Sequence, residues 1–103
     1  MNLQPRIKIG GVWYTIQLVP HMRLEDDCSG KAIPGRAIIK LDEDSCPQMM
    51  LADQIHEIFE IIDIENELKI PHRALQCLAT QWFQVLIDNP DVFDSERNRE
   101  KPI

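Results

Sequence analysis

The segment from residue 45 to residue 66 repeats apolar side chains at intervals of three and four, the pattern of an amphipathic helix. Its first residues, "SCPQ", fit a capping box with Ser45 at the N-cap and Gln48 three residues later. We therefore expect a long helix with one face against a core. The apolar face consists of Leu51, Ile55, Ile58, Phe59 and Ile62.

A second helical pattern follows "ELKIP", with Pro71 in its first turn, where a missing backbone N–H costs nothing. The polar "DNP" at residues 88–90 ends this pattern. The short turn predicts that the two helices are antiparallel neighbours. The core-facing residues of the second helix are predicted to be His72, Leu75, Leu78, Ala79, Trp82, Val85 and Leu86.

Strand patterns precede both helices. "RIKIGG" and "VWYTIQLV" are β-rich and meet at Gly10-Gly11, which indicates a hairpin. Residues 20–35 hold prolines, glycines and polar side chains and are expected to form an exposed loop. "RAIIKLD", residues 36–42, predicts a third strand.

These patterns predict an α+β fold, with a small, mostly antiparallel three-stranded sheet followed by two packed helices. Residues 1–90 are expected to form a single domain, because the chain shows no internal repeat and 103 residues suit one modest core. Residues 91–103 are charged and expected to form a flexible tail.

The net charge of −6 is concentrated in residues 45–70, which hold six acidic residues against Lys69 alone. This distribution argues against a nucleic-acid partner, which favours a basic patch, and suits a cation or a basic partner. No apolar run approaches the ~20 residues that span a bilayer, and no export signal core is present. We expect a cytoplasmic protein without a membrane partner. Its three cysteines, without CxxC spacing, are expected to be free thiols.

The first helix contains His56-Glu57-x-x-Glu60, one residue different from the HExxH signature of zinc peptidases. Residues four apart are neighbours on a helix, so His56 and Glu60 can converge on one ion. Zinc accepts imidazole nitrogen and carboxylate oxygen at similar distances, so a glutamate is a chemically acceptable ligand at the fourth position. Glu57 stands where that signature has its general base.

His72 is the candidate third ligand, because a catalytic zinc has three protein ligands and one open position. Antiparallel packing alone would leave His72 near the end of the first helix, so it reaches Glu60 only if the turn folds back. Asp63, about one turn beyond Glu60, is an alternative ligand or a carboxylate that orients a ligand histidine.

The run "GRAIIKLDEDSCPQMMLADQIHEIFEIIDIENELKIPHRALQCLATQWFQVLIDNP" resembles small HExxH-type proteins of bacteriophages and prophages. These are similar to the minimal zincin domain of ImmA/IrrE-like metallopeptidases. Residues 7–90 carry the resemblance, and its most specific parts are "QIHEI", the helix with Trp82, and "LIDNP". Glu60 departs from the signature, as does His72 where an acidic ligand is usual.

The resemblance implies a zincin-like fold and a metal-dependent peptidase, with zinc or another divalent metal as cofactor. It implies that His56 is a metal ligand, that Glu57 is the catalytic base, and that strand 36–42 is the edge that aligns a peptide or protein substrate.

Two further interpretations remain open. The same scaffold could be an inactive interaction protein whose acidic helix faces a basic partner. The metal site could instead be structural, with Asp63 or Cys77 as a fourth ligand. The sequence leaves the oligomeric state undetermined.

Overall fold

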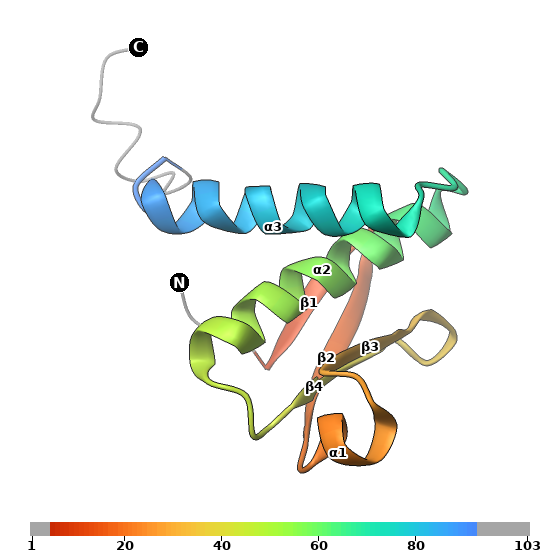
Figure 1. Cartoon of the computed structure of the whole chain (residues 1–103). Coiled ribbons are helices and arrows are strands. Elements are labelled where there is room, and N and C mark those ends of the chain that lie inside the picture. Colours follow the sequence, from red (N-terminus) through yellow and green to blue (C-terminus); the bar gives the residue numbers. More distant parts are fainter. Residues whose placement is uncertain (1–4, 93–103) are drawn as a thin grey trace.

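A computed structural model of the chain describes residues 5–92 (Figure 1), which form one α+β unit. The predicted tail lies outside the described residues, apart from Asp91 and Val92. Along the chain the elements are β1 (Arg6–Ile9), β2 (Val12–Val19), α1 (Met22–Asp26), β3 (Gly30–Ile33), the 3-10 turn η1 (Pro34–Arg36), β4 (Ile38–Asp42), α2 (Pro47–Glu65) and α3 (His72–Asp88).

The sheet has the strand order β1-β2-β4-β3, with two antiparallel pairings and a parallel one between β2 and β4. The predicted hairpin is confirmed: Gly10 and Gly11 join β1 to β2 with φ values of 56° and 83°. Two successive positive φ values suit glycine, which has no Cβ to clash. The predicted α+β class is confirmed, whereas the predicted three strands are four in the described residues.

The additional strand, β3, lies in the segment predicted to be an exposed loop, as do α1 and η1. β3 is only four residues long, which is too short for an alternation of apolar and polar side chains to be recognised. Its backbone pairing with β4 stabilises it instead. The expectation that strand 36–42 is an edge is wrong, because β4 lies between β2 and β3. Within residues 5–92 the edge strands are β1 and β3.

The two long helices, α2 and α3, form two layers on one side of the sheet. Figure 1 shows α2 against the sheet and α3 across α2. One buried cluster joins Tyr14, Ile39 and Leu41 of the sheet to Ile61 of α2. A second cluster joins Ile55 of α2 to α3 through Ala79 and Phe83. Because α2 contributes to both clusters, its side chains bridge the sheet and α3.

The predicted apolar faces are only partly correct. Ile55 is buried as predicted, but Ile62 is 40% exposed and its neighbour Ile61 is fully buried. The reason is that α2 packs against the sheet on one side and against α3 on another, whereas the sequence pattern predicted a single apolar face. On α3, Phe83 is buried although the pattern did not select it. The predicted core residues Leu78, Trp82 and Val85 of α3 are exposed.

The helix starts also differ from the prediction. Cys46, not Ser45, is the N-cap of α2, and no side chain caps it by a hydrogen bond. Pro47 at the first helical position supplies the preorganised φ instead. Pro71 is the N-cap of α3, so the helix begins at His72. Within residues 5–92 no helix is long and apolar enough to cross a bilayer.

The hydroxyl of Tyr14 ties the sheet to the end of α2 by donating to Oε1 of Glu65 at 2.9 Å. Burial, followed by this carboxylate, raises the pKa of Tyr14 above its usual value. Replacing Tyr14 with phenylalanine is expected to lower the free energy of unfolding by about 1.5–3 kcal/mol, the contribution of a hydrogen bond to a charged group. Urea denaturation measures it. In a Glu65→Ala background the same substitution should have no effect, and equal effects in both backgrounds would contradict this role.

Candidate metal centre

The chain reversal between α2 and α3 is a Schellman motif. The N–H of Glu67 donates to the carbonyl of Ile64 at 3.3 Å, and the N–H of Leu68 donates to that of Asp63 at 3.1 Å. Glu67 has a φ of 50° and so occupies the left-handed position where glycine is usual. Because no glycine occupies this turn, local sequence patterns did not predict its shape.

Asp63 holds the second half of the connection. Its Oδ1 accepts the N–H of Ile70 at 3.0 Å, while Lys69 between the two turns has a left-handed φ of 56°. Pro71 follows and α3 starts at His72. The turn therefore folds back along α2. This fold-back was predicted to be necessary for His72 to reach Glu60.

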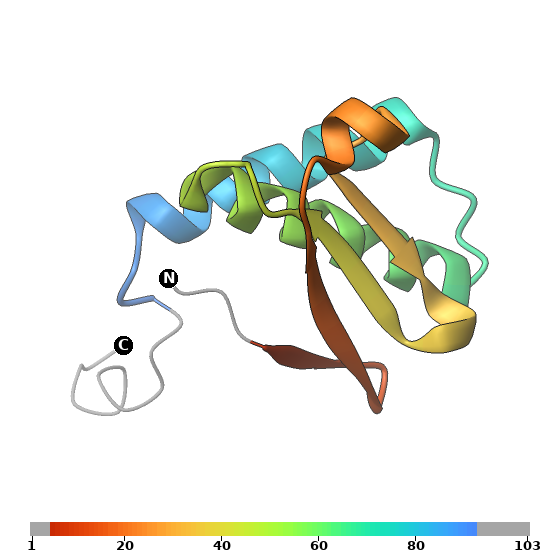
Figure 2. The same cartoon turned by 90° about the horizontal axis from the view of Figure 1, so that it is seen from below.

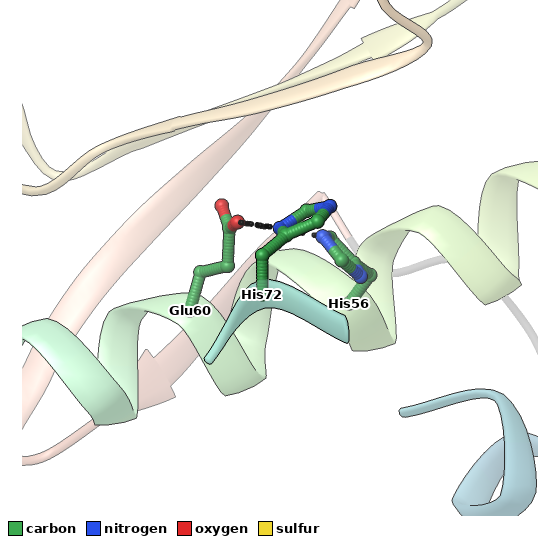
Figure 3. A group of neighbouring side chains, drawn as sticks. All are labelled: His56, Glu60 and His72. Carbon is green, nitrogen blue, oxygen red and sulfur yellow. Dashed lines mark ion pairs between the residues drawn. The ribbon is translucent and has the colours of Figure 1, made fainter. Parts of the chain in front are cut away.

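Three side chains converge where α3 crosses α2 (Figure 3). Nε2 of His56 lies 3.4 Å from Oε1 of Glu60, and Nδ1 of His72 lies 3.9 Å from the same oxygen. The two imidazole rings meet edge to face with centroids 5.7 Å apart. One potential ligand atom from each residue lies within 4.8 Å of the other two.

This spacing fits a tetrahedral cation. Ligand atoms at ~2.0–2.1 Å from zinc are about 3.3–3.4 Å apart in tetrahedral geometry. The pair on α2 is already at that separation, and His72 needs a small inward shift. His72 is free to make it, because its side chain is 72% exposed rather than facing the core as predicted. Two imidazole nitrogens and a carboxylate oxygen form a donor set suited to zinc.

A cavity of about 560 Å³ opens beside these residues. Gln76 and Thr80 of α3 line one part of it, and the start of β3 lines another. Cys28 lies in its lining, whereas Cys77, the possible fourth ligand, does not. Among residues 5–92 only the side chains of His56, Glu60 and His72 lie close enough together to share a cation, and no fourth ligand joins them. Oδ1 of Asp63 accepts the N–H of Ile70, so Asp63 orients the connection that leads to His72.

Glu57 lies in the cavity lining but is only 4% exposed. Its Oε1 is buried without a hydrogen-bond partner. A Cβ added to Gly30 would lie 3.2 Å from its Oε2, so glycine lets β3 approach α2 closely here. The sequence did not single out Gly30, since a close approach between two elements has no local signal.

The pKa of Glu57 is raised to about 8, first by burial and then by the neighbouring carboxyl groups of Glu60 and Asp53. A hydrogen bond to the backbone of Ala32 opposes this rise. The carboxyl group therefore favours its protonated form in the metal-free fold. An added cation would shift the balance towards the carboxylate.

This pKa predicts how the stability of the metal-free protein depends on pH. The folded state holds the proton of Glu57 up to about pH 8, whereas the unfolded chain releases it near the ordinary glutamate pKa of 4.5. As the pH rises from about 4.5 to about 8, the free energy of unfolding should therefore fall by up to about 1.4 kcal/mol per pH unit. Urea denaturation in a chelator should show this fall in the wild type and a smaller one in Glu57→Gln. Parallel profiles would refute the assignment.

No protein-family model matches the chain, and no curated protein or solved structure is significantly similar to it.

Proposed function

We propose that this protein binds a divalent cation, with zinc preferred, at a site resembling the minimal zincin domain of ImmA/IrrE-like metallopeptidases. The observation that carries the proposal is the convergence of His56, Glu60 and His72, whose ligand atoms lie within 4.8 Å of one another. Two of these residues share α2 and the third comes from α3, so the tertiary fold brings them together.

The proposed activity is hydrolysis of an amide bond in a peptide or protein. Nε2 of His56, Oε1 of Glu60 and Nδ1 of His72 would hold the cation, and three protein ligands are the number typical of a catalytic zinc. A bound cation supplies Lewis acidity towards water and a carbonyl oxygen. Glu57, one residue from His56 in the same cavity lining, takes a proton from water and passes it to the leaving amine.

The position of β3 at one edge of the sheet is consistent with a peptide substrate. Within the described residues β3 pairs with β4 on one side and with no strand on the other. An extended peptide could add to such an edge through backbone hydrogen bonds. The start of β3 lines the same cavity as the three proposed ligands, so a peptide bound there would pass close to them.

A second candidate is a cation-binding interaction protein that catalyses nothing. The burial of Glu57 favours it, since a base has to contact water and this carboxyl group is 4% exposed. In this candidate the acidic α2 and its cation would contribute to a contact with a basic partner.

Metal titration tests the proposal directly. The full chain would be stripped with a chelator, and the binding of Zn²⁺, Mn²⁺, Co²⁺ and Mg²⁺ would be followed by calorimetry and elemental mass spectrometry. We expect one zinc ion per chain and weak binding of Mg²⁺, because imidazole ligands suit zinc and oxygen ligands suit magnesium. Failure of every cation to bind would refute the proposal.

Asp63 should contribute to affinity without touching the cation. Asp63→Ala removes the acceptor for the N–H of Ile70 and frees the connection before His72. We expect zinc affinity to fall by about 10–100-fold, as for other groups that orient ligands. Competition with a chromophoric chelator measures it. Asp63→Asn keeps an acceptor oxygen and should lose much less, so equal losses in both variants would exclude this positioning role.

A further inference from the structure

Figure 2 views the sheet from the side away from α2 and α3. The strand register places a separate group of side chains on this face. Tyr14, Ile39 and Leu41 point into the core, so the alternate residues of these strands point outward. The strand register places Lys8 beside Trp13, and Lys40 beside both Gln17 and Lys31. We call this surface the outer sheet face. It comprises Arg6, Lys8, Trp13, Thr15, Gln17, Lys31, Ile33, Ile38 and Lys40.

This face is basic although the whole chain has a net charge of −6. It carries four cations, Arg6, Lys8, Lys31 and Lys40, and none of them forms an ion pair within residues 5–92. Asp42 continues the outward register at the end of β4, but it is 4% exposed and its Oδ1 accepts the N–H of Asp44. The positive charge of the face is therefore not neutralised by the described part of the chain.

The cations of this face are gathered at two places. Lys31 and Lys40 stand directly opposite each other on β3 and β4, an arrangement of like charges that destabilises a sheet. Across the face, Trp13 is 50% exposed and the guanidinium of Arg6 lies 4.3 Å from its ring centroid. Nζ of Lys8 lies 5.6 Å from the same ring. These cation–π contacts hold an aromatic ring and two charges together at the surface.

We propose that the outer sheet face binds single-stranded nucleic acid. Phosphates would contact the cations of β1 on one side and those of β3 and β4 on the other. These two sides are up to three strand spacings, about 14 Å, apart. Between them the half-exposed ring of Trp13 offers a stacking surface once Arg6, which lies over the ring, turns to a phosphate, and Thr15 and Gln17 offer hydrogen-bonding groups. Cations that follow a backbone, together with an aromatic platform for bases, are the usual means of binding single strands.

The arrangement favours this partner over two others. A membrane surface would require protruding apolar side chains among the cations, yet Ile33 and Ile38 on this face are half-buried, and the more exposed Val12 and Leu18 belong to the opposite register. An acidic peptide would use the charges but offers no π-face for Trp13. A nucleic-acid partner is contrary to the expectation drawn from the distribution of charge along the sequence, because that distribution does not show how strand pairing gathers cations on a face away from the acidic α2.

Fluorescence anisotropy of the full chain with a labelled oligothymidylate or oligouridylate of about 12 nucleotides tests the proposal. A chelator keeps the measurement independent of the metal site. We expect binding at low salt, with log K falling against log salt at a slope of up to about −3 for four cations. Lys31→Glu combined with Lys40→Glu should reduce that slope by about half and weaken binding at least about 10-fold.

Trp13→Ala should weaken binding at least about 5-fold through lost stacking. Arg73→Glu on α3 makes the same charge change per residue away from the face and should have little effect. No binding at low salt would overturn the proposal, as would equal affinities for wild type and both outer-face variants. Tighter binding of a polyglutamate peptide, or of vesicles containing phosphatidylserine, would assign the face to that partner instead.

Discussion

His72→Ala is expected to lower the affinity of the protein for zinc by about 100-fold or more. The substitution removes one of three ligands from a site whose total binding free energy would be spread over few contacts. It should leave the fold intact, because the side chain is 72% exposed and begins α3 at the surface. Calorimetric titration of the metal-stripped protein measures the affinity, and urea denaturation in a chelator checks the fold.

The chain supplies a matched control in His21. This histidine lies before α1 and forms an ion pair with Asp44 at 2.8 Å, outside the candidate ligand group. His21→Ala should therefore leave zinc affinity unchanged, whereas His56→Ala should reduce it as His72→Ala does. An equal loss in the His21 and His72 variants would indicate adventitious binding by surface histidines. Unchanged affinity in the His72 variant would remove that residue from the site.

Glu57→Gln is expected to reduce hydrolysis of peptides by the zinc-loaded protein at least 100-fold, the lower end of what a positioned acid–base group contributes. Glutamine keeps nearly the same size and polarity, so the cavity should be preserved. Zinc affinity should remain close to that of the wild type, because Glu57 is not among the proposed ligands. Mass spectrometry of a mixed peptide library before and after incubation measures the cleavage.

The result separates the two proposed functions. Cleavage by the wild type and not by the Glu57 variant supports a peptidase in which Glu57 is the base. Equal cleavage by both would require another proton acceptor. Zinc binding without cleavage by the wild type would favour the non-catalytic candidate, in which the buried carboxyl group of Glu57 never contacts the water it would have to activate.

Local patterns predicted those elements whose structure depends on local chemistry. The hairpin followed from Gly10-Gly11, because two left-handed positions favour glycine. Both long helices followed from apolar periodicity and from the prolines before them. In contrast, β3 is four residues long and depends on its pairing with β4. No periodic pattern of its own identified it.

The sequence by itself determined the chemistry at the candidate site. A histidine and a glutamate four residues apart are neighbours on any helix, so His56 and Glu60 meet whatever surrounds them. The tertiary structure alone decided whether His72 joins them. The Schellman turn with Glu67 in place of glycine, and the hydrogen bond from Ile70 to Asp63, bring it to 3.9 Å from Glu60. The same holds for the outer sheet face, because strand register gathers charges that are distant in sequence.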